Sequence, residues 1–132
     1  MAGFIVDQFP GLMCLETDPQ TGEMFKGTHD GAVIIINEKG VVHQRWECHS
    51  DYVWDLALDD QGRWVATASQ DGSVTIRKRT TGKHVETLLY HKGPVTTVDF
   101  SSCGHLIASG SIDRLVTVHE VSTGERITIL AK

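Results

Sequence analysis

The stretch VATASQDGSVTI, residues Val65–Ile76, decides the fold because the chain repeats it. A shift of 42 positions places it on IASGSIDRLVTV, residues Ile107–Val118, which keeps the same alternation and the same aspartate. A fainter copy lies about 41 residues upstream, around Asp30–Ile35. Internal similarity at a fixed period of this length is typical of a repeat architecture. The chain therefore contains three copies of one unit.

Each unit has an all-β pattern. Apolar and small residues alternate over short runs rich in Val, Ile and Thr, and Gly, Asp and Asn residues interrupt the runs. In the second copy we expect strands over Val53–Leu58, Trp64–Ser69, Ser73–Lys78 and Lys83–Leu89. In the third copy we expect strands over Val95–Phe100, Leu106–Ser111, Leu115–Glu120 and Arg126–Leu130. Four short antiparallel strands in every 40 to 45 residues are typical of a propeller blade.

Composition narrows the class of protein. The 132 residues are 40% hydrophobic and 22% charged, with a net charge of −5 that disfavours nucleic-acid binding. The longest apolar run, Ala32–Ile36, is too short to span a membrane, so no membrane insertion is expected. Three widely spaced cysteines and the absence of a basic N-terminal signal favour a cytoplasmic protein, with a nuclear or peripheral membrane location as alternatives. The spacing of the seven His residues matches no metal motif, and we expect neither metal nor cofactor.

The motifs Val65–Ile76 and Leu106–Asp113, with a His ahead of each first strand, resemble WD40 repeats. The resemblance implies an all-β fold of three WD40-type four-stranded antiparallel blades, part of a β-propeller. We expect the blades over about residues 10–48, 49–90 and 91–132, with 4–9 as an additional N-terminal outer strand. Closed propellers have four to eight blades, so the ring is expected to be incomplete within one chain. Self-association, a partner chain or a further C-terminal portion would each supply the missing blades.

The resemblance also assigns a hydrogen-bond network to each blade, formed by a His before the first strand, a Ser or Thr in the second, an Asp in the following turn and a Trp in the third. The matching residues are His49, Thr67 and Asp71 in the second copy, and His91, Ser109 and Asp113 in the third. The Trp is replaced by Ile36, Arg77 and His119 in the three copies, and we expect His119 to donate to Ser109. Copy one has Lys26 in place of the Ser or Thr, and Gln8 near the His position. Because a catalytic set is needed once and a folding device in every blade, recurrence favours a structural role and no enzyme activity.

Proteins of this family bind other proteins through the loops around the central channel. The matching positions precede the turn Asp or begin the first strand, and the candidates are His29, Tyr52, Trp54, Gln70, Thr96 and Ile112. Packing between blades would explain the Trp54 side chain as well as partner binding does. For His29, a solvated position in a turn is the favoured explanation. The basic run Arg77–Arg79 fits an acidic partner or a phosphoinositide headgroup, but a solvated loop at the end of a strand is the favoured interpretation. The acidic residues lie in separate turns, and nothing in the sequence pairs them for chemistry.

A narrower resemblance rests on the segments Gly27–Val33, Glu47–Ser50 and Ala66–Val74, which are similar to the N-terminal propeller of the Vps41-type subunit of the HOPS tethering complex. The first hypothesis is a non-enzymatic WD40 scaffold that mediates protein–protein interaction in a multi-subunit complex. One alternative is an oligomeric propeller that binds a glycan or a phosphoinositide. Another is a vesicle-tethering subunit in endosome-to-vacuole traffic.

Overall fold

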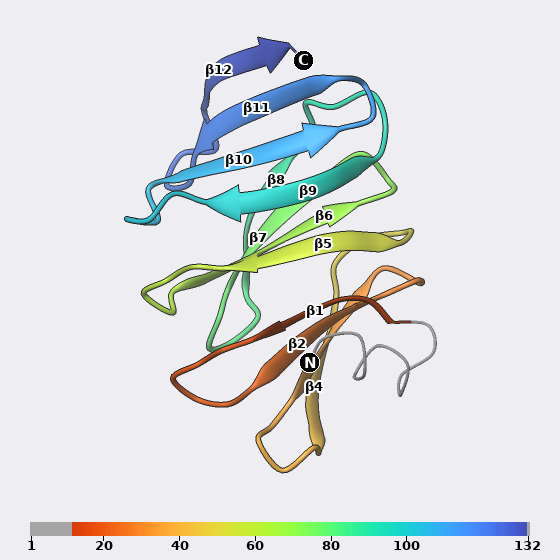
Figure 1. Cartoon of the computed structure of the whole chain (residues 1–132), viewed down its shortest axis with the longest axis vertical. Helices are drawn as coiled ribbons and strands as arrows, with labels where there is room; N and C mark the ends of the chain where they lie inside the picture. The colour runs from red at the N-terminus through yellow and green to blue at the C-terminus, as the bar shows by residue number, and fades with distance from the viewer. Residues whose placement is uncertain (1–11, 132) are drawn as a thin grey trace.

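A computed structural model describes residues 12–131, in which three antiparallel sheets follow one another (Figure 1). The first sheet contains β1 (Leu12–Thr17), β2 (Met24–Thr28), β3 (Ala32–Ile36) and β4 (Val42–Glu47). The second contains β5 (Val53–Leu58), β6 (Trp64–Ser69), β7 (Val74–Lys78) and β8 (His84–Leu88). The third contains β9 (Val95–Phe100), β10 (Leu106–Ser111), β11 (Leu115–Glu120) and β12 (Arg126–Ala131).

The predicted fold class is confirmed. Each sheet is a four-stranded meander of consecutive strands, and the three sheets do not close into a ring. We refer to the sheets as blades 1, 2 and 3. The strand expected over residues 4–9 lies outside the described residues, as does Gln8. Across residues 12–131 the structure has no helix with the length and apolar character that a membrane crossing requires.

Blade 2 has a tight turn between β6 and β7. The backbone N–H and the hydroxyl of Ser73 both donate to Asp71 Oδ1, at 2.9 and 2.6 Å. This side-chain-to-backbone turn occupies Ser73, so β7 begins at Val74, one residue later than the alternation predicts. Gly72 follows Asp71 with φ +88°, but the corresponding residue of blade 3 is Arg114, with φ +71°. Arg114 is the only residue other than glycine with a positive φ between residues 12 and 131.

The first strands of the three blades, β1, β5 and β9, lie side by side along one edge of the array (Figure 1). The fourth strands, β4, β8 and β12, form the opposite edge. The first strands therefore line the inner side of the propeller segment, and the fourth strands its outer side.

Two apolar cores join the blades, because side-chain alternation turns one face of each sheet toward its neighbour. The core between blades 1 and 2 contains Phe25, Val33, Ile35, Trp46, Leu56 and Val65. The core between blades 2 and 3 contains Ala57, Ala66, Ala68, Val74, Ile76, Leu88, Val95, Val98, Ile107 and Val121. Burial of these side chains stabilises the stacking of the blades.

Hydrogen bonds and ion pairs between neighbouring blades fix their relative position. Arg79, in the loop after β7, donates to Asp18 Oδ2 and Glu23 Oε1 of blade 1, both at 2.6 Å. Burial acts to raise the pKa of Asp18, but hydrogen bonds from the Gln20 backbone and from Arg79 outweigh it, and the pKa is lowered. Between blades 2 and 3, the guanidinium of Arg63 donates to the carbonyl of Cys103 at 2.8 Å. These bonds hold the blades in a defined relative position.

Candidate protein-interaction surface

The predicted network residues of blade 2 lie together. His49 Nε2 is 2.7 Å from Thr67 Oγ1, and His49 Nδ1 is 3.1 Å from Asp71 Oδ2. Thr67 Oγ1 also lies 2.5 Å from Thr75 Oγ1 on β7, its direct cross-strand neighbour. Burial lowers the pKa of His49 below its usual value, against the opposing effect of Asp71. Burial acts to raise the pKa of Asp71, but hydrogen bonds from Ser73 outweigh it and lower the pKa.

Blade 3 has the same arrangement, but the prediction made for His119 is not met. His91 Nδ1 is 3.1 Å from Asp113 Oδ2, and His91 Nε2 is 3.0 Å from Ser109 Oγ. The prediction that His119 donates to Ser109 is wrong. Thr117 lies opposite Ser109 in the sheet, and Thr117 Oγ1 is 2.9 Å from Ser109 Oγ. His119 is instead the cross-strand neighbour of Ile107, and among the described residues its buried Nδ1 has no hydrogen-bond partner.

Blade 1 is built differently. The hydroxyl of Thr28 is hydrogen-bonded to Asp30 Oδ1 and accepts the backbone N–H of Ala32 at 3.0 Å. The other carboxylate oxygen of Asp30 accepts a hydrogen bond from Arg45 at 2.9 Å. Lys26 occupies the position of Thr67, as the sequence shift predicts. The turn of blade 1 is therefore stabilised by the local hydrogen bonds of Thr28 and by the exposed ion pair between Arg45 and Asp30.

Four of the six predicted binding residues come together on one surface, and we call His29, Tyr52, Trp54 and Gln70 the aromatic cluster. The rings of Tyr52 and Trp54 meet edge to face, with centroids 5.7 Å apart and planes at 70°. On the other side of Tyr52 lies the ring of His29, from the blade 1 turn, with its centroid 6.5 Å away. The indole N–H of Trp54 donates to Gln70 Oε1 at 2.6 Å. The cluster thus extends across the boundary between blades 1 and 2.

The other two candidates occupy the corresponding positions of blade 3. The backbone N–H of Ile112 donates to the carbonyl of Pro94, just as that of Gln70 donates to the carbonyl of Tyr52. Ile112 is 66% exposed, although it is apolar. Thr96 is also exposed, and its hydroxyl lies 3.5 Å from the carbonyl of Gly110. Both residues therefore belong to the edge of the array that carries the aromatic cluster.

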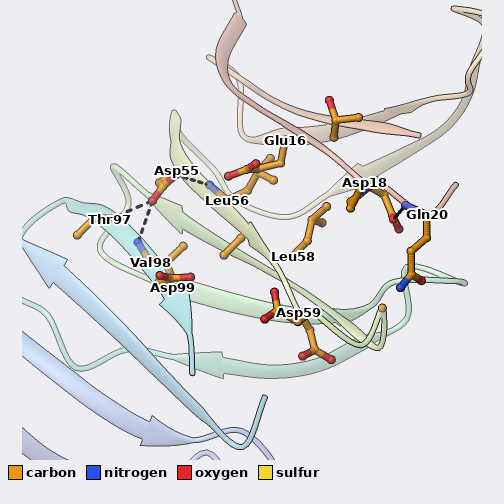
Figure 2. Close-up of a pocket in the computed structure, with 15 residues that line it drawn as sticks. Glu16, Asp18, Gln20, Asp55, Leu56, Leu58, Asp59, Thr97, Val98 and Asp99 are labelled. Atoms are coloured by element: carbon orange, nitrogen blue, oxygen red, sulfur yellow. Dashed lines mark hydrogen bonds between the residues drawn. The ribbon is translucent and has the colours of Figure 1, made fainter. Parts of the chain in front are cut away.

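The first strands also enclose an acidic pocket of about 520 Å³ that sequence reasoning missed (Figure 2). Its lining includes Glu16 of β1, Asp55 of β5 and Asp99 of β9, and within residues 12–131 no Lys or Arg belongs to it. Burial, and then the charges of Asp55 and Asp99, raise the pKa of Glu16. Burial also raises the pKa of Asp55, whose Oδ2 accepts the Val98 N–H at 3.0 Å (dashed in Figure 2). The three acids are far apart in the sequence. Glu16 and Asp99 hold the same repeat position, so the repeat could have related these two residues but not Asp55.

Two family models match the chain. The model described as "Vps42 beta-propeller" (Beta-prop_Vps41) matches residues 21–98, more than half of the chain. The model described as "WD domain, G-beta repeat" matches residues 82–120.

Three curated relatives are similar in sequence. The "Poly(A)+ RNA export protein" of Schizosaccharomyces pombe is 36% identical over 83 residues, 61% of this chain and 24% of that protein. The "Periodic tryptophan protein 2 homolog" of the same organism is 39% identical over 67 residues, 50% of this chain and 8% of that protein. A WD repeat-containing protein of Synechocystis, sll1491, is 37% identical over 128 residues, 93% of this chain and 36% of that protein. The chain thus spans about a third or less of the length of these relatives.

Solved structures show the same fold. The RRP9 WD40 repeats superpose with a TM-score of 0.88 at 23% identity, over 92% of this chain and 39% of that one. The structure of U3-55K gives the same TM-score and the same coverage at 22% identity. The repeat, the three four-stranded blades and the family matches agree. The chain belongs to the WD40-repeat family and, by the match over residues 21–98, to the Vps41 β-propeller family.

Proposed function

We propose that this chain is a non-enzymatic WD40 scaffold that mediates protein–protein interaction in a multi-subunit complex. The observation that carries the proposal is the aromatic cluster, where Tyr52 and Trp54 remain 40% and 36% exposed while their rings contact each other. Exposed Tyr and Trp side chains with fixed geometry are favoured anchors in protein interfaces, since they bury a large area at a small cost in side-chain entropy. Ile112 adds an exposed apolar side chain at the equivalent turn of blade 3.

The His, Thr or Ser, and Asp sets support a structural role over a catalytic one. Their order of contacts resembles that of a nucleophile, base and orienting acid. However, the hydroxyls of Thr67 and Ser109 are buried, and each is also hydrogen-bonded to a Thr of the neighbouring strand. A substrate carbonyl has no approach to a hydroxyl enclosed in this way. The two sets are better explained as buried hydrogen-bond networks that stabilise blades 2 and 3.

Electrostatics favour a protein partner over a phosphate-bearing ligand. The net charge is −5, and the described residues that line the pocket between the first strands include Glu16, Asp55 and Asp99 but no Lys or Arg. Such a surface repels nucleic acid and phosphoinositide headgroups. The three cysteines, Cys14, Cys48 and Cys103, are free thiols, which fits the proposed cytoplasmic location.

Site-specific photo-cross-linking in cell extract tests the proposal. A photoreactive side chain replaces Tyr52 or Ile112 in two variants, and Leu89, which is also exposed but lies beyond β8 at the outer edge, in a control. We expect the same discrete adduct from positions 52 and 112 and none from position 89. Adducts that form equally at all three positions, or only at position 89, would contradict the proposal.

The second candidate is the vesicle-tethering role that the Vps41 family suggests, and the match over residues 21–98 favours it. In that case the partners would be other subunits of the HOPS tethering complex. Co-purification of purified tethering-complex subunits with the chain, and its loss in Trp54→Ala, is the expected result. A folded wild-type chain that retains none of these subunits, yet still forms the adduct at positions 52 and 112 in extract, would favour the general scaffold role.

A further inference from the structure

The aromatic cluster offers a partner ring faces rather than hydrogen-bond donors. The indole N–H of Trp54, the only donor of that side chain, is already bonded to Gln70 Oε1 at 2.6 Å. Trp54 and Tyr52 nevertheless remain exposed, with their rings at 70° to each other. The face of an aromatic ring carries partial negative charge and attracts cations, and that of Trp does so most strongly. A positively charged side chain is therefore a suitable occupant of this cluster.

The acidic pocket starts at the next residue of β5. Asp55 directly follows Trp54 and lines the pocket with Glu16 of β1 and Asp99 of β9 (Figure 2). Along β5 and the turn after it, the lining continues to Asp60. An extended chain spans about 3.3 Å per residue, so a bound segment of a few residues is long enough to contact both the rings and the pocket.

Three of the acids that line the pocket lack a compensating cation. Glu16, Asp55 and Asp99 form no ion pair within the described part of the chain, and no Lys or Arg of that part lines the pocket. Burial, and then the charges of Asp55 and Asp99, raise the pKa of Glu16. Burial raises the pKa of Asp55 as well, although the Val98 N–H donates to it. A cation placed among these carboxylates would stabilise their charged forms.

Asp59 adds a buried carboxylate to the wall of the same pocket. Its side chain is fully buried, and Oδ2 accepts a hydrogen bond from Arg63 Nε at 2.9 Å. Among the described residues, Oδ1 of Asp59 has no hydrogen-bond partner. A buried acceptor without a donor is unfavourable, and positive charge in the adjoining pocket would offset part of that cost.

We propose that the aromatic cluster and the acidic pocket together bind a basic peptide segment of the partner, with one Arg or Lys side chain over the Trp54 ring and a second in the pocket. This proposal rests on the interaction role proposed above and names the chemistry of the partner. A guanidinium or ammonium group suits both places, because aromatic faces and carboxylates each attract cations. The pocket, at about 520 Å³, has room for such a side chain. Every residue of the site belongs to the three blades described, whatever other blades complete the ring.

Selection from a displayed library of random linear peptides, on the purified chain, tests the chemistry of the bound segment. Peptides that Trp54→Ala also retains are set aside, because they bind elsewhere on the chain. We expect the remaining peptides to contain more Arg and Lys than the input library, with at least two such residues each. Their binding should weaken as the salt concentration rises, since the contacts with the pocket are between charges.

Fluorescence anisotropy of one selected peptide then separates the two contacts. Trp54→Phe keeps an aromatic face and should bind the peptide about fivefold more tightly than Trp54→Leu, which is apolar without a ring. Glu16→Gln removes a charge from the pocket and should weaken binding about threefold. Glu38→Gln is the matched control, since it removes the same charge from an exposed turn outside the pocket and should leave binding unchanged. Far-UV circular dichroism verifies that all variants remain folded.

The possible results distinguish this proposal from the interaction role on which it rests. Peptides that depend on Trp54 but contain no excess of Arg or Lys would overturn the basic-peptide proposal and leave the interaction role intact. Equal binding by Trp54→Phe and Trp54→Leu, or by Glu16→Gln and Glu38→Gln, would also overturn it, because the ring or the pocket would then take no part. A selection in which no peptide depends on Trp54 would contradict both.

Discussion

The indole N–H of Trp54 donates to Gln70 Oε1 across 2.6 Å, so the second residue of β5 is hydrogen-bonded to the turn that follows β6. Both positions were candidates for partner binding from the sequence. The bond fixes the orientation of a partly exposed indole before any partner arrives, which reduces the entropy lost on binding. Tyr52 then bridges Trp54 to His29 of blade 1. The result is a preorganised surface that depends on the packing of blade 1 against blade 2.

Arg114→Gly should stabilise the protein. Arg114 holds φ +71° at a position where blades 1 and 2 have glycine, and a left-handed conformation costs a residue with a Cβ about 1 kcal/mol. We expect the free energy of unfolding in urea to rise by about that amount. Arg114→Ala keeps the Cβ and should give no gain. A gain of the same size in both variants would show that loss of the Arg side chain, not relief of the backbone, is responsible.

Gly31→Ala should destabilise the protein more than Gly62→Ala. Both glycines have a positive φ, so each substitution carries about 1 kcal/mol of backbone strain. A Cβ on Gly31 would also lie 2.1 Å from the His49 carbonyl oxygen, whereas the nearest atom to one on Gly62 is 3.9 Å away. We expect a further loss of about 2 kcal/mol for Gly31→Ala from this overlap. Equal losses in urea unfolding would mean that the loop before blade 2 moves aside at no cost.

Thr67→Val should destabilise blade 2 without changing its shape. The substitution removes a buried hydroxyl that lies between His49 Nε2 and Thr75 Oγ1, and leaves both without that partner. The expected loss is about 1–3 kcal/mol in the free energy of unfolding. Thr87→Val, on the exposed face of β8, is the control and should change stability by less than about 0.5 kcal/mol. Similar values for the two variants would argue against the network as a stabilising element.

His119→Leu should stabilise the protein and reduce its sensitivity to acid. Burial lowers the pKa of His119 below 6.5, so the unfolded chain takes up a proton there more readily than the folded one. The stability that depends on neutral His119 is present above pH 6.5 and is lost as the pH falls toward the lowered folded pKa. Removal of the unpartnered Nδ1 should add about 1 kcal/mol at pH 7, and the slope of stability against pH below 6.5 should decrease. His49, whose pKa burial also lowers, contributes to the slope that remains. An unchanged slope would show that His119 is not a source of the acid sensitivity.

The sequence was sufficient to predict the strands of the second and third copies and the grouping into three blades, because side-chain alternation is a local property and a turn that contains Asp recurs in each copy. It could not predict which residue would partner Ser109. Family likeness pointed to position 119, but strand register places Thr117 opposite Ser109 and leaves His119 opposite Ile107. Register depends on the turn between β10 and β11, which the repeat alone does not specify.

The acidic pocket was missed for a related reason. Glu16 and Asp99 are far apart in the chain, and Asp55 stands at a different repeat position, so no spacing rule connects them. They meet because three first strands stack side by side, and that stacking is a tertiary property. Likewise, His29 and Tyr52 were separate candidates, and their contact appears only once blades 1 and 2 are packed.

The most direct test of the account is the dissociation constant of the cross-linked partner, once purified, for wild-type protein and Trp54→Ala. Leu89→Ala serves as the matched control on the outer edge. The account predicts that Trp54→Ala weakens binding by about 30-fold, the effect of losing roughly 2 kcal/mol at an interface anchor, with Leu89→Ala unchanged. A Trp54→Ala variant that folds and binds the partner as tightly as wild type would contradict the account.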